Sequence, residues 1–289
     1  MSRAVTTLVL SSRPLSWVNT AFPFGLTYYL FVGQFDARLI VGSLFFLIPY
    51  NALMYGINDV FDYESDLRNP RKGGLEGALL PPELHRPMIL VSTVLPLPFV
   101  LALILWGSLE STGVLALSLF FVVAYSAKGF RFKEIPFVDS VTSSLHFVMP
   151  AVFAMALVSA PLGGLALTLL ASFFLWGMAS HAFGAVQDVV ADREAGVGSI
   201  ATAIGARGTV RFAVALYVLS GALLLLIPWP LPLIAPVALL YIGALVPWWS
   251  VSDAEAWQAN RSWKWFLALN FVAGAAVMLV VFEWWRLAS

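Results

Sequence analysis

The fold is decided by one acidic stretch, Asn58-Asp59-Val60-Phe61-Asp62-Tyr63-Glu64-Ser65-Asp66, which directly follows a long apolar segment. On a helix that turns by about 100° per residue, Asp59, Asp62 and Asp66 fall within roughly 60° of one another. Asn58 lies beside them, whereas Glu64 points about the opposite way. The stretch therefore predicts a helix end that carries three carboxylates and an amide on one face.

The rest of the chain is strongly apolar, since 60% of its 289 residues are hydrophobic and only 11% are charged. Apolar runs of about twenty residues are long enough to cross a bilayer as helices. Nine such runs are expected, at residues 14–33, 39–60, 88–106, 111–128, 137–160, 161–187, 209–228, 231–250 and 264–284. The sequence therefore predicts an all-α, polytopic membrane protein, a bundle of nine transmembrane helices in a single domain over residues 1–289.

The net charge is zero, so total charge favours neither a nucleic acid nor an acidic partner, but the distribution of charge is informative. With nine spans, the N-terminus and the loops after the even-numbered spans share one side of the membrane. That side holds fourteen of the sixteen Lys and Arg residues and leaves Arg38 and Arg286 for the other. Because basic loops stay in the cytoplasm, we expect a multi-pass protein of the cell membrane. Its N-terminus and its loops near 61–87 and 188–208 would be cytoplasmic, and its C-terminus would lie on the opposite side.

Cysteine is absent, which excludes disulfides, thiolate metal sites and cysteine nucleophiles. No small-residue cleavage site precedes the first predicted span, so we expect no removable signal peptide. Because cysteine is absent, metal ligands and reactive groups in this chain must be oxygen or nitrogen atoms.

A second acidic site lies at the end of the sixth predicted span. Asp188 and Asp192 are one helical turn apart and share a face, and His181 lies about two turns earlier in the same angular sector. Each acidic site ends an even-numbered span and precedes a flexible basic loop, and the first aspartates of the two sites are 129 residues apart. This pattern indicates a weak internal repeat of architecture.

Aspartates that faced lipid near the bilayer centre would each cost about 3 kcal/mol, so we expect these side chains to line an enclosed or water-filled cavity. Hard oxygen ligands suit Mg²⁺, which proteins hold with a few carboxylates together with substrate phosphate. The sequence therefore predicts a Mg²⁺-diphosphate site whose metal ligands are Asn58, Asp59, Asp62, Asp66, Asp188 and Asp192, the five aspartates being catalytic. The alternatives are a structural ion network and a cation-coupled membrane transporter.

Cations should surround this site, because five carboxylates and a diphosphate carry more negative charge than about two Mg²⁺ ions neutralise. The candidates at the same membrane face are Arg13, Arg68, Lys128, Arg131, Lys133 and Arg193. An interfacial anchor for Arg13 and a generic aromatic and basic belt around residues 125–134 are the alternatives. The residues placed to line the path below the diphosphate are Asn51, Tyr55, Tyr125 and His181. For His181, a hydrogen-bonded polar residue inside the bundle is the other interpretation.

A diphosphate at the membrane boundary above an apolar cavity suggests an isoprenoid donor, whose allylic cation aromatic faces can shelter. The spacings Asn58-Asp59-x-x-Asp62-x-x-x-Asp66 and Asp188-x-x-x-Asp192 resemble the two signature motifs of the UbiA-type intramembrane prenyltransferases, and residues 125–134 resemble their third characteristic stretch. The resemblance covers nearly the whole chain. It implies an all-helical bundle, Mg²⁺ dependence and a lateral opening to lipid.

Four short sequence segments are most similar to the bacterial lycopene elongases that make C50 carotenoids. This similarity covers Ser12-Arg13-Pro14-x-Ser16-Trp17-Val18-Asn19-Thr20, residues 55–66, residues 69–74 and residues 185–194. One position departs from many relatives, which carry a lysine four residues after the tyrosine. Here Gly129 takes that place, and Lys128 is three residues after Tyr125.

The resemblance implies Mg²⁺-dependent transfer of a C5 dimethylallyl group from dimethylallyl diphosphate to each end of lycopene. The terminal alkene would attack the allylic cation, and the resulting tertiary cation would end by proton loss or water capture. Prenylation of an aromatic quinone precursor is the alternative. The predicted spans place no Lys or Arg at mid-depth for an acceptor carboxylate, which favours a hydrocarbon. The expected partners are the isoprenyl diphosphate donor, the carotenoid acceptor, the bilayer and other carotenoid-pathway enzymes.

Overall fold

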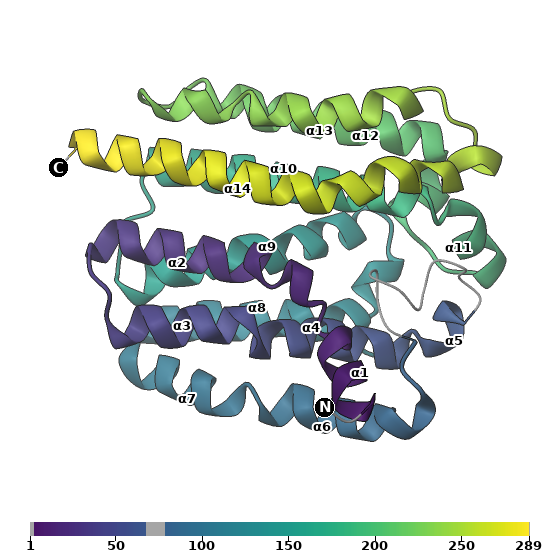
Figure 1. The fold of residues 1–289 in the computed structure, drawn as a ribbon, viewed down its shortest axis with the longest axis horizontal. Coiled ribbons are helices and arrows are strands. Elements are labelled where there is room, and N and C mark those ends of the chain that lie inside the picture. The colour runs from purple at the N-terminus through teal and green to yellow at the C-terminus, as the bar shows by residue number, and fades with distance from the viewer. Residues whose placement is uncertain (1–2, 68–78, 289) are drawn as a thin grey trace. The chain divides into compact units, whose positions relative to one another are not determined.

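The computed structural model describes residues 3–67 and 79–288, and all regular structure within them is helical (Figure 1). The helices are α1 (Arg3–Ser11), α2 (Val18–Val32), α3 (Ala37–Leu47), α4 (Pro49–Phe61), α5 (Tyr63–Asp66), α6 (His85–Val94), α7 (Leu97–Trp106), α8 (Leu109–Ser126), α9 (Val138–Leu157), α10 (Gly164–Val186), α11 (Val189–Ala195), α12 (Ile200–Leu224), α13 (Val237–Leu245) and α14 (Asn260–Ala288), with the short 3-10 helices η1 (Pro14–Ser16), η2 (Pro82–Leu84), η3 (Phe132–Glu134), η4 (Leu231–Ile234), η5 (Val246–Trp248) and η6 (Asp253–Ala259) between them. The predicted all-α fold is confirmed.

Eight described stretches are long and apolar enough to cross a membrane: Ala37–Phe61, Pro82–Trp106, Leu109–Ser126, Val138–Leu157, Gly164–Val186, Ile200–Leu224, Leu231–Trp248 and Ala268–Leu287. They correspond to the last eight of the nine predicted spans. The first predicted span forms α2, whose 15 residues rise by only about 22 Å. The chain is thus a multi-pass membrane protein, in agreement with the sequence.

Two of the predicted spans are broken at prolines. The span over 39–60 becomes α3 and α4, which meet at Pro49, and the span over 88–106 becomes α6 and α7, which meet just before Leu97 at Pro96. Proline lacks the N–H that continues a helix and clashes with the preceding turn. The breaks therefore follow directly from the sequence.

The chain divides into two compact units, each with its own core. Unit 1 comprises Met1–Phe132 and Met149–Ala160, and unit 2 comprises Lys133–Val148 and Pro161–Ser289. The helix α9 contributes its first half to unit 2 and its second half to unit 1. The single domain expected over the whole chain stays a prediction.

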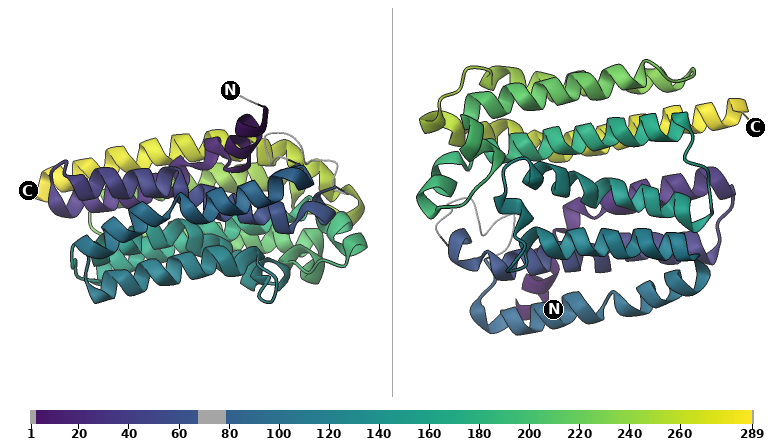
Figure 2. Two further views of the ribbon diagram at one scale, coloured as in Figure 1. Left: turned by 90° about the horizontal axis from the view of Figure 1, so that it is seen from below. Right: turned by 180° about the vertical axis from the view of Figure 1, so that it is seen from behind.

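Unit 1 is held together by aromatic rings between α2, α3 and the end of α9. The ring of Phe24 lies 5.2 Å from that of Phe46 and 6.0 Å from that of Phe153, centroid to centroid. The helices α2 and α3 run alongside one another in Figures 1 and 2. Their close approach depends on Gly42, because the Phe24 ring occupies the space where a side chain would begin.

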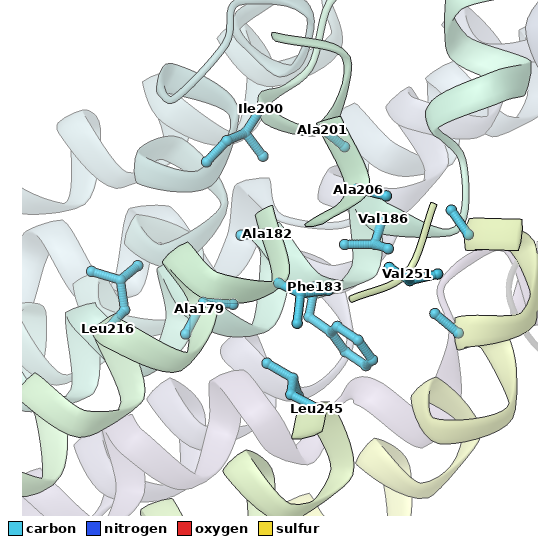
Figure 3. Packing of buried hydrophobic residues seen from close by; sticks show 14 of the residues in the cluster. Ala179, Ala182, Phe183, Val186, Ile200, Ala201, Ala206, Leu216, Leu245 and Val251 are labelled. Carbon is cyan, nitrogen blue, oxygen red and sulfur yellow. The ribbon is translucent and has the colours of Figure 1, made fainter. Parts of the chain in front are cut away.

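Unit 2 is built on the long helices α10 and α12. Small residues such as Ala179 and Ala182 let the two helices approach closely, as is common between membrane helices. Figure 3 shows the Phe183 ring in the same cluster as Leu245. The pair is also joined by buried hydroxyls, since Ser172 Oγ donates to Ser220 O over 3.0 Å. This framework fixes the end of α10, where the second acidic site begins.

Gly42→Ala should destabilise unit 1, because the added Cβ would overlap the fully buried ring of Phe24. Overpacking of this kind costs about 1–3 kcal/mol. Thermal unfolding in detergent measures the loss. Gly113→Ala is the matched control: its Cβ would meet no atom within 4 Å, and alanine is the better helix former. Equal melting temperatures for Gly42→Ala and wild type would contradict the packing described.

Candidate active site

The first acidic motif does not lie on one straight helix. The helix α4 ends at Phe61, and Asp62 takes φ −98° and ψ −1°, while its N–H still donates to Asn58 O over 2.9 Å. A new turn, α5, then begins, and Asp66 N–H donates to Asp62 O over 2.8 Å. The predicted common face therefore holds up to Asp62, whereas Asp66 belongs to a short helix with its own direction.

The three carboxylates of this motif are buried, since Asp59, Asp62 and Asp66 are 1%, 6% and 7% exposed. Buried carboxylates need compensating charge or hydrogen bonds. Within the described residues, Arg13 Nη2 lies 2.9 Å from Asp59 Oδ1. The amide of Asn58 donates to Asp62 Oδ2 over 2.7 Å and to Ser126 Oγ over 2.9 Å. Asn58 thus orients a carboxylate in addition to its predicted role as a ligand.

Arg13 is held in an unusual backbone conformation, with φ 52°. Its guanidinium lies over the ring of Tyr55, 4.4 Å from the centroid. Burial lowers the pKa of Arg13, but Asp59, together with smaller contributions from Tyr55 and Asp66, raises the pKa above its ordinary value. The structure therefore places the predicted residues Arg13, Tyr55 and Asp59 together as one charged and aromatic group.

Arg131 approaches the same motif from the turn after α8. Gly129 adopts φ 99°, a conformation that glycine reaches without a steric penalty, and the chain turns back so that Arg131 N–H donates to Ala127 O. Arg131 Nη2 then lies 3.9 Å from Asp62 Oδ1. This geometry gives a physical reason for glycine at position 129, because the turn needs a positive φ there. Lys128 is exposed on the same turn.

Asn51 lies deeper on α4 and is fully buried. Its amide donates to Thr20 Oγ1 over 2.7 Å, to Phe46 O over 2.8 Å and to Leu47 O over 3.1 Å. These bonds tie α4 to α2 and α3, so Asn51 has a structural task. Its predicted place along the substrate path stays a prediction.

The second acidic motif repeats the local backbone of the first. The helix α10 ends at Val186, and Asp188 takes φ −100° and ψ −5°, nearly the values of Asp62. Asp192 N–H then donates to Asp188 O over 2.8 Å, as Asp66 does to Asp62. The structural counterparts are therefore Asp62 with Asp188 and Asp66 with Asp192, each 126 residues apart (188 − 62 and 192 − 66). The separation of 129 residues compares aspartates that are not equivalent.

The segment after Asp188, expected to be a glycine-rich loop to residue 208, is mostly helical. It forms α11, a turn at Gly196 with φ 70°, and the start of α12 at Ile200. Ser199 caps α12 in a reciprocal pair with Thr202, and its hydroxyl also donates to Asp192 Oδ2 over 3.3 Å. The cap thus joins the second motif to the first turn of α12, and the capping pattern is what the sequence analysis missed.

A buried carboxylate that sequence reasoning did not single out lies close to this cap. Asp139 is fully buried in the first turn of α9 and accepts from the N–H of Ile200 over 2.7 Å. A lone acid three residues after Pro136, at the start of an apolar span, was the signal available in the sequence. Acids in spans usually have a partner and a function.

Arg193, predicted to contact diphosphate, is engaged elsewhere in unit 2. Its Nη1 lies 2.6 Å from Asp253 Oδ2, and its Nη2 donates to Thr202 O over 3.3 Å. The other oxygen of Asp253 accepts from Ala206 N–H over 2.7 Å, where α12 breaks at Gly205 with φ 72°. The backbone hydrogen bond from Ala206 lowers the pKa of Asp253, burial partly opposes this, and Arg193 lowers it further. A diphosphate contact for Arg193 stays a prediction.

The remaining candidates are less constrained by the structure. Tyr125 and Lys133 are partly exposed, and so is His181, whose ring contacts Ser140. Arg68 lies outside the described residues. Among residues 3–67 and 79–288, no three His, Asp or Glu side chains gather closely enough to hold a metal ion by themselves. Magnesium is typically held by one or two carboxylates together with substrate oxygens, so binding of this kind does not require such a cluster.

Residues 21–285 match the model of the UbiA prenyltransferase family. The chain belongs to this family. It is 49% identical over 281 residues to the "Lycopene elongase/hydratase" of Corynebacterium glutamicum, with 97% of this chain and 98% of that protein covered. It is 52% identical over 278 residues to the "C(50) beta-cyclic carotenoids biosynthesis protein LbtBC" of Dietzia sp. (strain CQ4). That match covers 96% of this chain but only 64% of the length of the Dietzia protein.

Solved UbiA structures share the fold. The structure of a UbiA homolog from Archaeoglobus fulgidus bound to DMAPP and Mg²⁺ matches with a TM-score of 0.68 at 18% identity, over 93% of this chain and 99% of that chain. The apo structure of a UbiA homolog from Aeropyrum pernix K1 matches with a TM-score of 0.62 at 18% identity, over 96% of this chain and 99% of that one. The UbiA protein described here is therefore a membrane prenyltransferase, and the predicted family and enzyme class are confirmed.

Asp253 should matter more for stability than its ion-pair partner Arg193. Asp253→Ala removes the acceptor for Ala206 N–H, a cap-like bond of about 1 kcal/mol. Arg193→Ala removes a half-exposed ion pair, worth about 0.5 kcal/mol, and a long, exposed hydrogen bond to Thr202 O. Asp253→Asn keeps an acceptor oxygen and should fall close to Arg193→Ala. Chemical denaturation in detergent measures all three, and an equal loss for Arg193→Ala and Asp253→Ala would reject this ranking.

Proposed function

We propose that this UbiA prenyltransferase transfers a C5 dimethylallyl group from dimethylallyl diphosphate to the ends of lycopene, in C50 carotenoid biosynthesis. The observation that carries the proposal is the 49% identity with a lycopene elongase/hydratase over almost the full length of both chains. Relatives that carry the same printed name also occur in Haloferax volcanii and Halobacterium salinarum, at 31% and 33% identity. The fourteen-to-two distribution of Lys and Arg supports a place in the cell membrane with a cytoplasmic N-terminus.

The residues at the two motifs fit Mg²⁺ by their chemistry. Aspartate oxygens and the Asn58 amide oxygen are hard donors, and no thiol competes, because the chain has no cysteine. In the proposal, Asn58, Asp59, Asp62 and Asp66 of unit 1 and Asp188 and Asp192 of unit 2 hold the metal ions. Bound Mg²⁺ would neutralise charge that develops on the departing diphosphate.

The cations of unit 1 would position the diphosphate. Arg13 and Arg131 already lie at 2.9 and 3.9 Å from carboxylate oxygens of the first motif, so each is held where an anion close to that motif can be met. The stacking of Arg13 on Tyr55 fixes the guanidinium, which reduces the entropy lost on binding. Arg68, Lys128, Lys133 and Arg193 are proposed as further phosphate partners.

The hydrocarbon acceptor is proposed on the grounds of charge. A hydroxybenzoate-type acceptor carries a carboxylate, which a cation deep in the membrane would have to meet. The predicted spans offer no Lys or Arg at mid-depth. A carotenoid end group needs no such partner and enters from the lipid.

Purified protein in detergent or nanodiscs should form C45 and C50 products from lycopene, dimethylallyl diphosphate and Mg²⁺, with release of diphosphate. Liquid chromatography with mass detection identifies the products. Chelation of the metal by EDTA should abolish them. Efficient prenylation of a hydroxybenzoate in place of lycopene would instead support the quinone-precursor alternative, and ion uptake into liposomes without diphosphate release would support a transporter.

Asp62→Asn and Asp188→Asn should each lower kcat/KM by roughly 100-fold, because each removes one charge from the electrostatic machinery of the reaction. The two losses should be similar, since the two aspartates occupy equivalent backbone positions. Steady-state assays of diphosphate release measure the effect.

Glu64→Gln and Glu194→Gln are the matched controls, because both glutamates are exposed and belong to the same helical turns as the motifs. They should retain activity within about twofold of wild type. A comparable loss in Glu64→Gln and Asp62→Asn would show that general acidity of the loop, and not the motif, carries the activity.

A further inference from the structure

Unit 2 contains a chain of three polar side chains close to the second acidic motif, and two of the three are fully buried. Asp139 and Ser140 are both fully buried in the first turn of α9. Ser140 Oγ donates to Asp139 Oδ1 over 3.3 Å and lies 3.1 Å from Nδ1 of His181 on α10. Asp139, Ser140 and His181 thus form a continuous carboxylate, hydroxyl and imidazole relay.

The hydrogen bond from Ser140 to Asp139 favours one tautomer of His181. A carboxylate oxygen accepts only, so the hydroxyl hydrogen of Ser140 points to Asp139. Ser140 Oγ then accepts the hydrogen on His181 Nδ1, which leaves the basic lone pair of the imidazole on Nε2. In this arrangement a proton taken up at Nε2 creates a positive charge that the Asp139 carboxylate stabilises through Ser140.

The carboxylate remains fixed as the relay is used, because other bonds hold it. Asp139 Oδ2 accepts from Ile200 N–H and Oδ1 accepts from Ser140 N–H, each over 2.7 Å. Ile200 begins α12, whose N-terminus favours negative charge. Asp139 is therefore held in place by backbone N–H groups, with no side-chain cation among its described contacts.

His181 lies deeper in unit 2 than the second acidic motif. It is on α10, seven residues before Asp188, which is about two helical turns or roughly 10 Å along the axis. In the repeat that pairs Asp62 with Asp188, the counterpart of His181 is Tyr55 (181 − 55 is again 126), which contacts Arg13 beside the first motif. The ring of His181 is also partly exposed, unlike Asp139 and Ser140 behind it.

We propose that His181 is the catalytic base that ends the transfer by proton loss, with Ser140 and Asp139 as positioning residues; this rests on the proposed function. The diphosphate leaves with the electron pair of its C–O bond, and the acceptor alkene supplies the electrons of the new C–C bond. The tertiary cation that results loses a proton from an adjacent carbon to His181 Nε2. The electrons of that C–H bond form a new C=C bond, and the imidazolium then releases its proton to water, which restores the neutral base.

His181→Gln tests the role, because glutamine keeps a donor for Ser140 but accepts no proton near neutral pH. With lycopene, dimethylallyl diphosphate and Mg²⁺, the rate of formation of alkene-ended product should fall roughly 100-fold. Water should capture the longer-lived cation, so the ratio of hydroxylated to alkene-ended product should rise at least tenfold. The KM for dimethylallyl diphosphate should stay within about twofold of wild type.

Asp139→Asn is the second variant, since asparagine still offers an oxygen to Ile200 N–H but removes the charge behind the imidazolium. It should change the product ratio in the same direction as His181→Gln. Ser172→Ala is the control: it removes an equally buried hydroxyl from α10, where Ser172 bonds to Ser220, and should leave the ratio unchanged. Product ratios and KM are measured together with the melting temperature of each variant.

The possible results distinguish failure of the proposed function from failure of the assignment of His181 as the base. Wild type that forms no C45 or C50 product overturns the proposed function itself. Wild type that forms them, with an unchanged product ratio in both His181→Gln and Asp139→Asn, overturns only the assignment of the base. An equal fall of both kinds of product in step with a lower melting temperature also overturns it, because a structural role alone predicts that pattern.

Discussion

The structure depends on the cost of placing carboxylates inside a membrane helix bundle, about 3 kcal/mol for each one that meets lipid at mid-depth. Unit 1 meets this cost with a cation and an amide, as Arg13 lies against Asp59 and Asn58 donates to Asp62. The left-handed backbone conformation of Arg13 and the turn at Gly129 place the side chains of Arg13 and Arg131 close to these carboxylates. Unit 2 meets the cost with helix caps, in which Ser199 and the N–H of Ile200 donate to Asp192 and Asp139. The two units thus use different means for the same purpose.

The repeat explains why the means differ. Equivalent backbone positions lie 126 residues apart, and the two helix breaks at Asp62 and Asp188 have almost identical dihedral angles. At the same separation, Tyr55 corresponds to His181. The first copy therefore carries an aromatic ring where the second carries an imidazole. Arg13 compensates Asp59 in unit 1, whereas backbone N–H groups compensate Asp139 in unit 2.

Much of the fold and of the candidate site follows from the sequence, because hydropathy fixes the spans and local spacing fixes the motifs. Pro49 and Pro96 indicate where two spans are broken, but the length of an apolar run does not show these breaks. The kink at Asp62 was beyond reach, since helical arithmetic assumes a continuous helix. The pairing of Arg193 with Asp253 joins residues 60 positions apart, and no local pattern specifies it. Asp139 was overlooked because a lone acid has no spacing to reveal its partner, the N-terminus of α12.

The way in which a buried carboxylate is compensated decides what it can still do. In a carboxylate paired directly with arginine, such as Asp59, the guanidinium largely neutralises the negative charge. A second cation nearby would also be repelled by that arginine. A carboxylate anchored by backbone N–H groups, such as Asp139, is fixed by dipoles that carry no net charge. Its full negative charge remains able to stabilise a cation that forms only for part of the catalytic cycle. In a low-dielectric bundle that difference is large, so Asp139 is better placed than Asp59 to stabilise a cation that forms beside it.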